Sequence, residues 1–162
     1  LTAAARTLNS EGLADKFDIA VYGTVVDGFQ NEFERLLSDV PNMTYKGAFD
    51  AATGDVCAEL NMYDAAVSSS SWREGMSGSN IECKFAGVAN IVSDAGFNPE
   101  CVGNGVDGLI VRPRNVGSLV EAMRSVIEDR GLLARLKRNS YEDRVNYDVA
   151  TWKREVLDVV CG

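Results

Sequence analysis

The sequence predicts an α/β fold in which helices cover both faces of a parallel sheet. Two observations lead to this class. Short apolar runs alternate with stretches of helical periodicity along most of the chain, an order that is typical of strand–helix–strand units. The length of 162 residues and the hydrophobic share of 46% suit one domain with one core. Because no repeat or linker divides the chain, we expect a single domain over residues 1–162.

The first half of the chain is expected to hold three helices and two strands. A stripe formed by Phe29, Phe33 and Leu37 indicates an amphipathic helix that ends before Pro41. Gly23 ends the first apolar run. In order, the expected elements are a helix over 1–13, a strand over 17–22, a helix over 29–37, a strand over 43–47 and a helix over 56–62.

The second half continues the alternation and ends in helix. Pro99 stands in the first turn of a short helix, where proline is tolerated, and Pro113 closes the last strand. In order, the expected elements are a strand over 65–68, a helix over 79–86, a strand over 90–93, a short helix from Asn98, a strand over 108–111 and a helical region over 118–160.

The start of the chain departs from this alternation. Each half of a doubly wound α/β fold usually begins with a strand, and the loop after that strand contacts the ligand. This chain begins at Leu1 and enters a helix. We therefore expect a Rossmann-like sheet whose first strand lies upstream of Leu1.

Composition and charge exclude several classes of function. Aspartate and glutamate number 24 against 16 lysine and arginine, so the formal net charge is −8, and we expect no binding to nucleic acid. Histidine is absent, which removes Ser/His and Cys/His catalytic pairs and the commonest metal ligand. The chemistry of any site must therefore come from carboxylates, hydroxyls, backbone amides or a bound substrate.

The cysteines and the apolar runs indicate the cellular compartment in which the protein works. Cys57, Cys83, Cys101 and Cys161 are too widely spaced for a zinc knuckle or a redox motif, and we expect free thiols in a reducing cytosol. No apolar run approaches the roughly 20 residues that span a bilayer, and no basic leader precedes an apolar stretch. We expect a protein in the cytoplasm or at the cytosolic face of a membrane.

The segment over residues 71–82 has the features of an anion-binding turn. It joins the carboxyl end of a strand to a helix, which is where open α/β sheets bind their ligands. Ser77 is a suitable N-cap, which leaves the amides of Gly78, Ser79 and Asn80 free to face an anion.

Two carboxylates flank this turn. Glu82 lies about one helical turn further along, where its two oxygens suit both hydroxyls of a ribose. Glu74 precedes the glycine turn and can face the same crevice from the other side. The arrangement fits a sugar diphosphate. A plain strand-to-helix connection with structural glutamates has the same spacing, so the residues alone leave both interpretations open.

The stretch from Glu74 to Glu82 resembles the E-x7-E signature of retaining glycosyltransferases with the GT-B fold, family four in particular. The likeness continues on both sides of the signature and covers nearly the whole chain in the right order. Further stretches that are similar to the family are Val21–Gly23, Tyr45–Gly47, Gly87–Glu100, Gly105–Pro113 and Leu119–Asp129. The resemblance implies the C-terminal, donor-binding half of a two-domain enzyme, which is one half of a GT-B fold.

In that family the matching residues bind a nucleotide sugar. The resemblance implies that Glu74 is the catalytic residue, which contacts the donor hexose and stabilises the reacting sugar, and that Glu82 holds the ribose. The base is expected beside the turn that matches Gly47 and Ala48. The substrate-binding residues implied in this way are Gly75, Met76, Ser77, Gly78, Ser79, Glu82, Gly47 and Ala48.

The resemblance also implies a reaction. A sugar moves from a nucleotide sugar, such as a UDP- or GDP-sugar, to an acceptor with retention of anomeric configuration. Amide dipoles and positive charge stabilise the leaving phosphate. The acceptor, which is a sugar, a lipid or a small molecule, is held mainly by an N-terminal domain upstream of Leu1. No cofactor and no metal are implied, and the sequence contains no Asp-x-Asp pair that would hold a metal ion.

The chain departs from the family at several positions. Ala89 stands where proline is common, and Cys83 and Lys84 stand where small apolar residues are common. The family's basic pair that grips the diphosphate belongs upstream of Leu1. We therefore expect this acidic chain alone to be inactive and to bind its donor weakly, with backbone amides and Arg73 or Lys84 offsetting the phosphates.

Three other functions stay open at this point. A nucleotide-binding or interaction module would keep the fold without sugar transfer. A nucleotide-sugar epimerase with the same fold is disfavoured, because such enzymes use other carboxylate patterns and usually histidine. A plain Rossmann-like domain would retain both glutamates for structural reasons alone.

Overall fold

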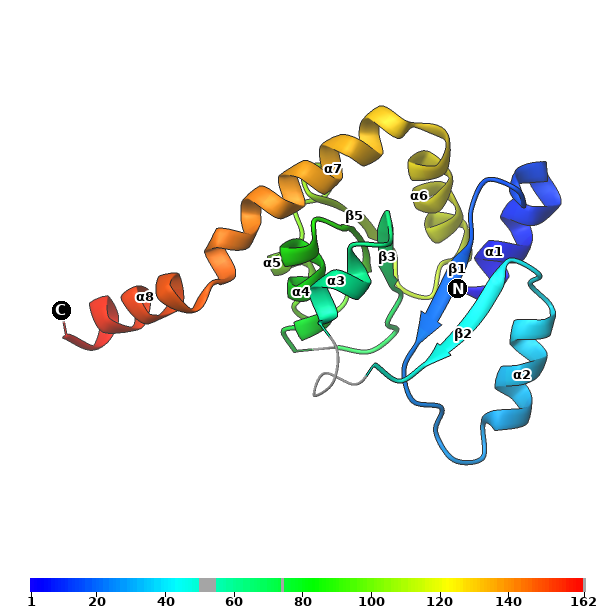
Figure 1. Ribbon diagram of the computed structural model, residues 1–162, viewed down its shortest axis with the longest axis horizontal. Helices are drawn as coiled ribbons and strands as arrows, with labels where there is room; N and C mark the ends of the chain where they lie inside the picture. Colours follow the sequence, from blue (N-terminus) through cyan, green and yellow to red (C-terminus); the bar gives the residue numbers. More distant parts are fainter. Residues whose placement is uncertain (50–54, 74, 162) are drawn as a thin grey trace.

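The computed structural model describes residues 1–49, 55–73 and 75–161, with only the backbone at 155 and 158–161. Strands and helices alternate as the sequence predicts (Figure 1). The strands are β1 (Ile19–Tyr22), β2 (Met43–Gly47), β3 (Ala65–Ser68), β4 (Ala89–Ser93) and β5 (Gly108–Val111). The helices are α1 (Thr2–Leu8), α2 (Gln30–Ser38), α3 (Val56–Leu60), α4 (Gly78–Ala86), α5 (Asn98–Cys101), α6 (Val116–Glu128), α7 (Arg130–Asp143) and α8 (Val149–Cys161), with a π-helical turn η1 (Asn9–Leu13) and a 3-10 turn η2 (Arg144–Tyr147).

The strands form two parallel sheets rather than the single sheet that we expected. β1 pairs with β2, and β4 lies between β3 and β5. Within the described residues, β1 and β3 each pair on one side only. Every residue of β1 and β3 is only half-buried although these strands are mostly apolar, whereas all five residues of β4 are buried. The α/β class is confirmed, and the division leaves one edge of β1 and one edge of β3 unpaired.

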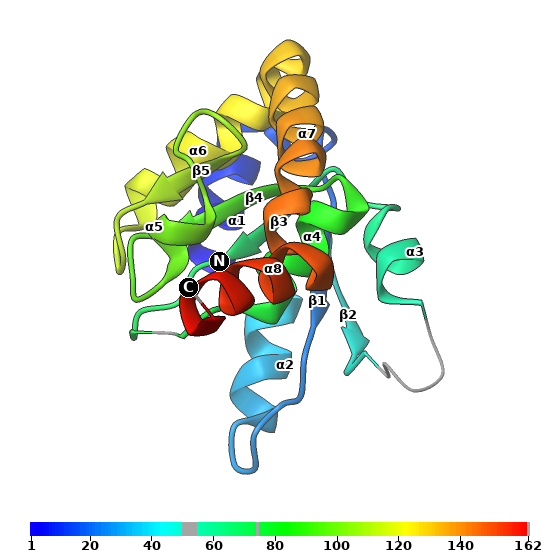
Figure 2. The ribbon, with the colours of Figure 1, turned by 90° about the vertical axis from the view of Figure 1, so that its left-hand side faces the viewer.

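Helices cover both faces of the three-stranded sheet (Figure 2). α1, α6 and α7 lie on one face, where Ala89 and Ile91 of β4 join their core. α3 and α4 lie on the other face, where Ala66 of β3 packs against them, and Val92 faces the α5 segment. A central parallel strand that is covered on both faces is mostly apolar, and the apolar pair Ile91 and Val92 is the signal by which the sequence predicts β4. The larger core is made of Ala4, Leu8, Ala89, Ile91, Val111, Leu119, Val120, Met123, Val126, Leu133 and Leu136.

The predicted helical region over 118–160 is divided into separate helices. Asp129 accepts a hydrogen bond from the amide of Leu132 at 2.8 Å, and Asp148 accepts one from the amide of Thr151 at the same distance. Each aspartate therefore caps the helix that follows it, because its oxygen satisfies an amide that has no partner in the first turn. The divisions give the chain end a bent course instead of one long helix.

We call α7, η2 and α8 together the C-terminal arm. Figure 1 shows α7 passing over the body of the domain and α8 extending away from it. Among the residues that the structure describes, no helix is long and apolar enough to cross a membrane. Among the side chains of α8 that the structure describes, the large apolar ones that are exposed are Val149, Trp152, Val156 and Leu157.

Gly108 provides a test of the packing between β4 and β5. A Cβ atom at this position would lie 2.4 Å from the backbone oxygen of Asn90 and 2.6 Å from a methyl group of Val102. Gly108→Ala is expected to lower the free energy of unfolding by about 2 kcal/mol or more, because the neighbouring strand cannot move away. Gly117→Ala in α6 is the matched control, since a Cβ there meets no atom closer than 3.5 Å. It should raise stability by about 0.5 kcal/mol. Urea denaturation followed by circular dichroism measures both, and equal effects would contradict the packing.

Candidate functional site

The predicted donor-binding loop connects β3 to α4. Glu74, the predicted catalytic residue, lies outside the described residues. On its carboxyl side Gly75, Met76, Gly78 and Ser79 are exposed and Ser77 is half-buried. The loop therefore presents its backbone and one long apolar side chain to solvent at the amino end of a helix, where the peptide dipoles place partial positive charge.

The first turn of α4 differs in detail from the expected anion site. Ser77 is the N-cap residue with an extended backbone, but its hydroxyl makes no capping hydrogen bond and instead lies 2.9 Å from the hydroxyl of Ser79. The amide of Asn80 donates to the carbonyl of Ser77 at 3.1 Å. Of the three amides that we expected to face an anion, the Asn80 amide is therefore occupied. Those of Gly78 and Ser79 are the two that the turn can offer.

Glu82 lies one turn further along α4 and is exposed. Within the described part of the chain, no basic side chain lies within ion-pair distance of its carboxylate. Its oxygens are thus available to accept hydrogen bonds from hydroxyl groups of a ligand.

The Gly47 turn lies at the end of β2, in the other sheet. Gly47 has a left-handed backbone (φ 85°), and its carbonyl accepts a hydrogen bond from the amide of Gly23 at 3.1 Å. Ala48 is exposed. Among the described residues, no hydrogen bond joins this turn to α4 or to its preceding loop. The predicted site residues therefore belong to two groups: Gly75–Ser79 and Glu82 belong to α4 and the loop before it, whereas Gly47 and Ala48 lie at the end of β2 in the other sheet.

Helix α3 connects the two groups. Tyr22, at the end of β1, donates a hydrogen bond to Glu59 of α3 and lies 2.7 Å from the hydroxyl of Tyr63. On its other side α3 packs against α4 through Cys57 and Leu60. The burial of the Tyr22 hydroxyl and its bond to the Glu59 carboxylate raise the pKa of Tyr22, so this side chain stays protonated as a donor.

Three buried asparagines, which the sequence analysis did not identify, hold the amino end of α4. The side-chain amide of Asn80 donates to Asn98 at 3.0 Å, and Asn98 donates to the carbonyl of Ser93 at 3.0 Å. Asn90 of β4 donates to the backbone oxygen of Asn80 at 3.1 Å. We call these three residues the asparagine relay. The signal that could have revealed it is Asn90, a polar residue in the middle of an apolar strand.

The same relay region fixes the loop before the site. The hydroxyl of Ser93 donates to the carbonyl of Ser70 at 2.6 Å. Ser93 therefore uses its carbonyl for Asn98 and its hydroxyl for the four-serine segment. Ser93 and Asn98 are buried and the bond from Ser93 to Ser70 is partly buried, so the start of the predicted donor-binding loop is tied to the same strand end that holds Asn98.

A pocket of ≈ 630 Å³ adjoins the donor loop at the ends of β3, β4 and β5. Trp72 is 76% exposed, and the guanidinium of Arg114 lies 5.5 Å from the centre of its ring. Arg114 has a left-handed backbone (φ 55°), which is uncommon outside glycine. The pocket thus combines aromatic, acidic and basic side chains. Its lining residues are Ser71, Trp72, Arg73, Asp94, Ala95, Gly96, Phe97, Glu100 and Pro113.

Of the two cations that we expected to offset donor phosphates, only Arg73 is placed to do so. Arg73 is exposed and lines the pocket. The expectation for Lys84 was wrong: its side chain is fully buried and pairs with Asp107 and Asp143. The reason is geometric, because Lys84 lies on the face of α4 that packs against the body of the domain, opposite to Glu82.

Comparison with known proteins establishes the family. The family described as "Glycosyl transferases group 1" matches residues 11–143, and the chain belongs to this family. An N,N'-diacetylbacillosaminyl-diphospho-undecaprenol alpha-1,3-N-acetylgalactosaminyltransferase of Campylobacter jejuni is 35% identical over 78 residues, which are 48% of this chain and 21% of that protein.

Solved structures share the fold. HepE of Anabaena, solved in complex with UDP and glucose, has a TM-score of 0.78 at 18% identity, over 98% of this chain and 44% of HepE. The C-terminal domain of the group 1 protein LpcC from Francisella tularensis has the same TM-score and identity, over 91% of this chain and 78% of that domain. The chain thus spans less than half of HepE and most of a C-terminal domain.

The asparagine relay can be tested by removing Asn98. Asn98→Ala leaves the side-chain amide of Asn80 without a partner and removes one of the two hydrogen bonds that the Ser93 carbonyl accepts, the other coming from the amide of Ala95 at 2.8 Å. It should lower the free energy of unfolding by about 2 kcal/mol. Asn139→Ala is the control, because Asn139 also donates to a carbonyl, that of Val106 at 2.7 Å, but does so at the surface. It should cost about 0.5 kcal/mol or less. Chemical denaturation measures both, and equal losses would show that the relay carries no special weight.

Proposed function

We propose that this chain is the donor-binding part of a retaining glycosyltransferase that moves a sugar from a nucleotide sugar to an acceptor. The observation that carries the proposal is the geometry of α4. The amides of Gly78 and Ser79 stand at its amino end, and the unpaired carboxylate of Glu82 stands one turn further along. Amides suit phosphate oxygens and a carboxylate suits the two hydroxyls of a ribose, so one helix offers both groups in the order that a nucleoside diphosphate needs.

Each residue of the site has a role in this proposal. Glu74 contacts the donor hexose and stabilises the positive charge that develops on the reacting sugar. The segment Gly75–Ser79 holds sugar and diphosphate, and the amides stabilise the negative charge of the leaving phosphate. The base lies by Gly47 and Ala48. No cofactor and no metal take part.

The sequence analysis allowed a UDP-sugar or a GDP-sugar as the donor, and the related proteins support a UDP-sugar. HepE has been solved with UDP, with UDP and glucose, and with UDP-glucose. The name of the Campylobacter relative specifies a lipid diphosphate acceptor. We therefore propose a lipid-linked or sugar acceptor and a protein that works in the cytoplasm at the cytosolic face of a membrane.

Two features of the fold support a second half of the enzyme. One edge of β1 and one edge of β3 are unpaired, and Ile19 of β1 and Val67 of β3 pack on the same core. A strand from upstream of Leu1 that pairs with both would complete one doubly wound sheet. The apolar side chains exposed on α8, Trp152 among them, would then pack against the acceptor-binding domain.

Nucleotide binding by the chain itself can be measured by thermal unfolding. UDP, GDP and ADP at millimolar concentration are the probes, and we expect UDP to raise the melting temperature, since a ligand at 100 times its Kd adds about 2.7 kcal/mol. Glu82→Ala should abolish most of the shift. Glu121→Ala, which removes an exposed carboxylate from α6, should leave it intact. No shift with any nucleotide at saturating concentration would contradict the proposal.

Transfer requires the protein with its upstream residues. Glu74→Ala and Glu82→Ala are each expected to lower transfer from the donor by about 10² or more, the cost of removing one stabilising group from a charged transition state. Activity is measured as release of UDP from UDP-sugars. Normal transfer by the double variant would contradict the assigned roles, and nucleotide binding without turnover of any donor would favour a module that has lost transfer.

A strand from upstream of Leu1 can be tested by amide hydrogen exchange in the two strands that it would pair with. Amide hydrogen exchange in β1 and β3 should slow when the upstream residues are present, because the unpaired edges of both strands would gain partners. Exchange in β4, which is paired on both sides already, should stay the same. Unchanged exchange in β1 and β3 would show that no strand enters between them.

A further inference from the structure

Lys84 is the largest fully buried side chain among the described residues. An ammonium group loses its hydration when it is buried, which costs several kcal/mol unless it gains partners. Its Nζ donates to Asp107 and, at 2.7 Å, to Asp143, and it lies 5.4 Å from the centre of the Tyr147 ring. Burial lowers the pKa of Lys84 and the two carboxylates raise it further than burial lowers it, so the pKa is raised and the side chain stays charged.

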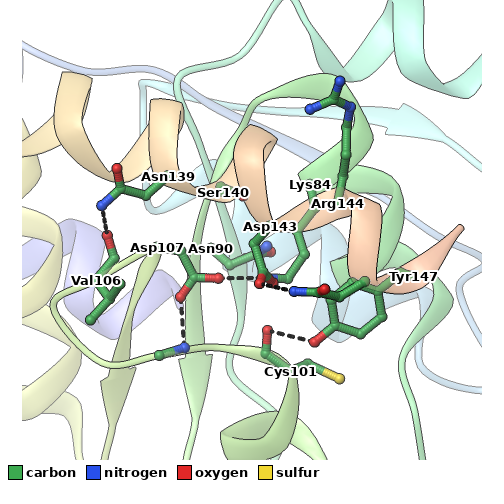
Figure 3. A network of polar contacts seen from close by, with 12 residues as sticks. Lys84, Asn90, Cys101, Val106, Asp107, Asn139, Ser140, Asp143, Arg144 and Tyr147 are labelled. Atoms are coloured by element: carbon green, nitrogen blue, oxygen red, sulfur yellow. Dashed lines mark hydrogen bonds and ion pairs between the residues drawn. The ribbon is translucent and has the colours of Figure 1, made fainter. Parts of the chain in front are cut away.

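The partners of Lys84 come from three other parts of the chain (Figure 3). Asp107 belongs to the loop before β5, where its second oxygen accepts the amide of Gly103 at 2.6 Å. Asp143 ends α7, and Tyr147 ends η2 and donates to the carbonyl of Cys101 at 3.5 Å. Lys84 therefore joins the donor helix to the C-terminal arm, and α4 contacts both α7 and η2.

The position of Lys84 on α4 shows which face of the helix this link holds. Residues two apart on a helix point to opposite sides, so Lys84 faces inward where Glu82 faces solvent. Asn80, one turn before Lys84, lies on the same inner face and is held by the asparagine relay. An apolar face can slide or rotate at little cost, whereas two sets of directed polar contacts one turn apart fix both the rotation and the register of the helix.

We propose that Lys84 is a positioning residue for the donor site, which fixes the rotation of α4 and so the direction of Glu82, and that the C-terminal arm holds it in place through Asp143. The inference rests on the proposed function, because it assigns Glu82 to the ribose. It makes the seating of the arm a condition for donor binding: when Asp143 withdraws, Lys84 loses one carboxylate and α4 gains freedom to turn.

The test removes Asp143, because it is one-third exposed and its loss need not unfold the protein. Asp143→Asn is expected to raise the Kd for UDP, measured by calorimetry, about fivefold. The decisive readout is a double-mutant cycle with Glu82→Ala. If Lys84 acts through Glu82, Asp143→Asn should have no further effect on UDP binding once Glu82 is gone, whereas a merely structural role predicts that the two losses multiply.

Two further variants complete this test, one as a control and one that removes the buried charges themselves. Asp64→Asn removes the carboxylate that holds another part of α7, through Lys137 at 3.0 Å, and should leave UDP binding within about twofold of the wild type. Lys84→Met combined with Asp107→Asn removes the buried charges at nearly constant volume, so it should fold and should weaken UDP binding at least as much as Asp143→Asn.

Amide exchange separates failure of this inference from failure of the proposed function. In the absence of nucleotide, Asp143→Asn should speed exchange over residues 78–86 about fivefold and leave β4 unchanged. Unchanged exchange in α4, unchanged UDP binding or multiplied losses in the cycle would each overturn the positioning role. Faster exchange in a protein that does not bind UDP at all would support the link between arm and helix while contradicting the proposed function.

Discussion

β4 lies between two layers of helices, and all five of its residues are buried. A polar side chain in such a strand has no water to bind, so Asn90 must find its partner inside the protein. It finds the backbone of Asn80 at the start of α4, and Ser93 at the end of the strand binds both Asn98 and the carbonyl of Ser70. The burial of β4 thereby fixes the loop before the site, the helix after it and the short helix α5 in one arrangement.

The site that results depends on backbone groups and carboxylates more than on positive charge. The chain carries a net charge of −8, and the structure uses Lys84 inside the domain. Amides at a helix end bind phosphate without a counter-charge because their dipoles are fixed in place by the fold.

The edges of the two sheets and the C-terminal arm both expose apolar surface. β1 and β3 present half-buried apolar strands with one free edge each, and α8 presents a row of apolar side chains. Both are costly to expose in water. Lys84 ties the base of the arm to α4 through its bonds to Asp107 and Asp143.

The order and the approximate bounds of the strands were predictable, because most strands are short apolar runs with turn residues near their ends: Gly23 stops β1, and Pro113 follows β5. The turn between β3 and α4 was also predictable, since glycines and serines between a strand and a helix are local features; the roles of this turn and of Glu82 in donor binding stay predictions. The asparagine relay was not predicted, because Asn90 alone stands out as a polar residue in an apolar strand, whereas Asn80 and Asn98 are ordinary polar residues until the fold brings them together.

The sequence by itself determined the α/β class and the order of the elements, because periodicity and turn chemistry are local properties. Only the tertiary structure decided how the strands divide into two sheets and where Lys84 points. Strand pairing and the burial of a charge depend on partners that are distant in sequence, Asp107 and Asp143 in the case of Lys84. A lysine on a short helix has the same local pattern whether it faces solvent or two buried carboxylates, and the fold alone supplies those partners.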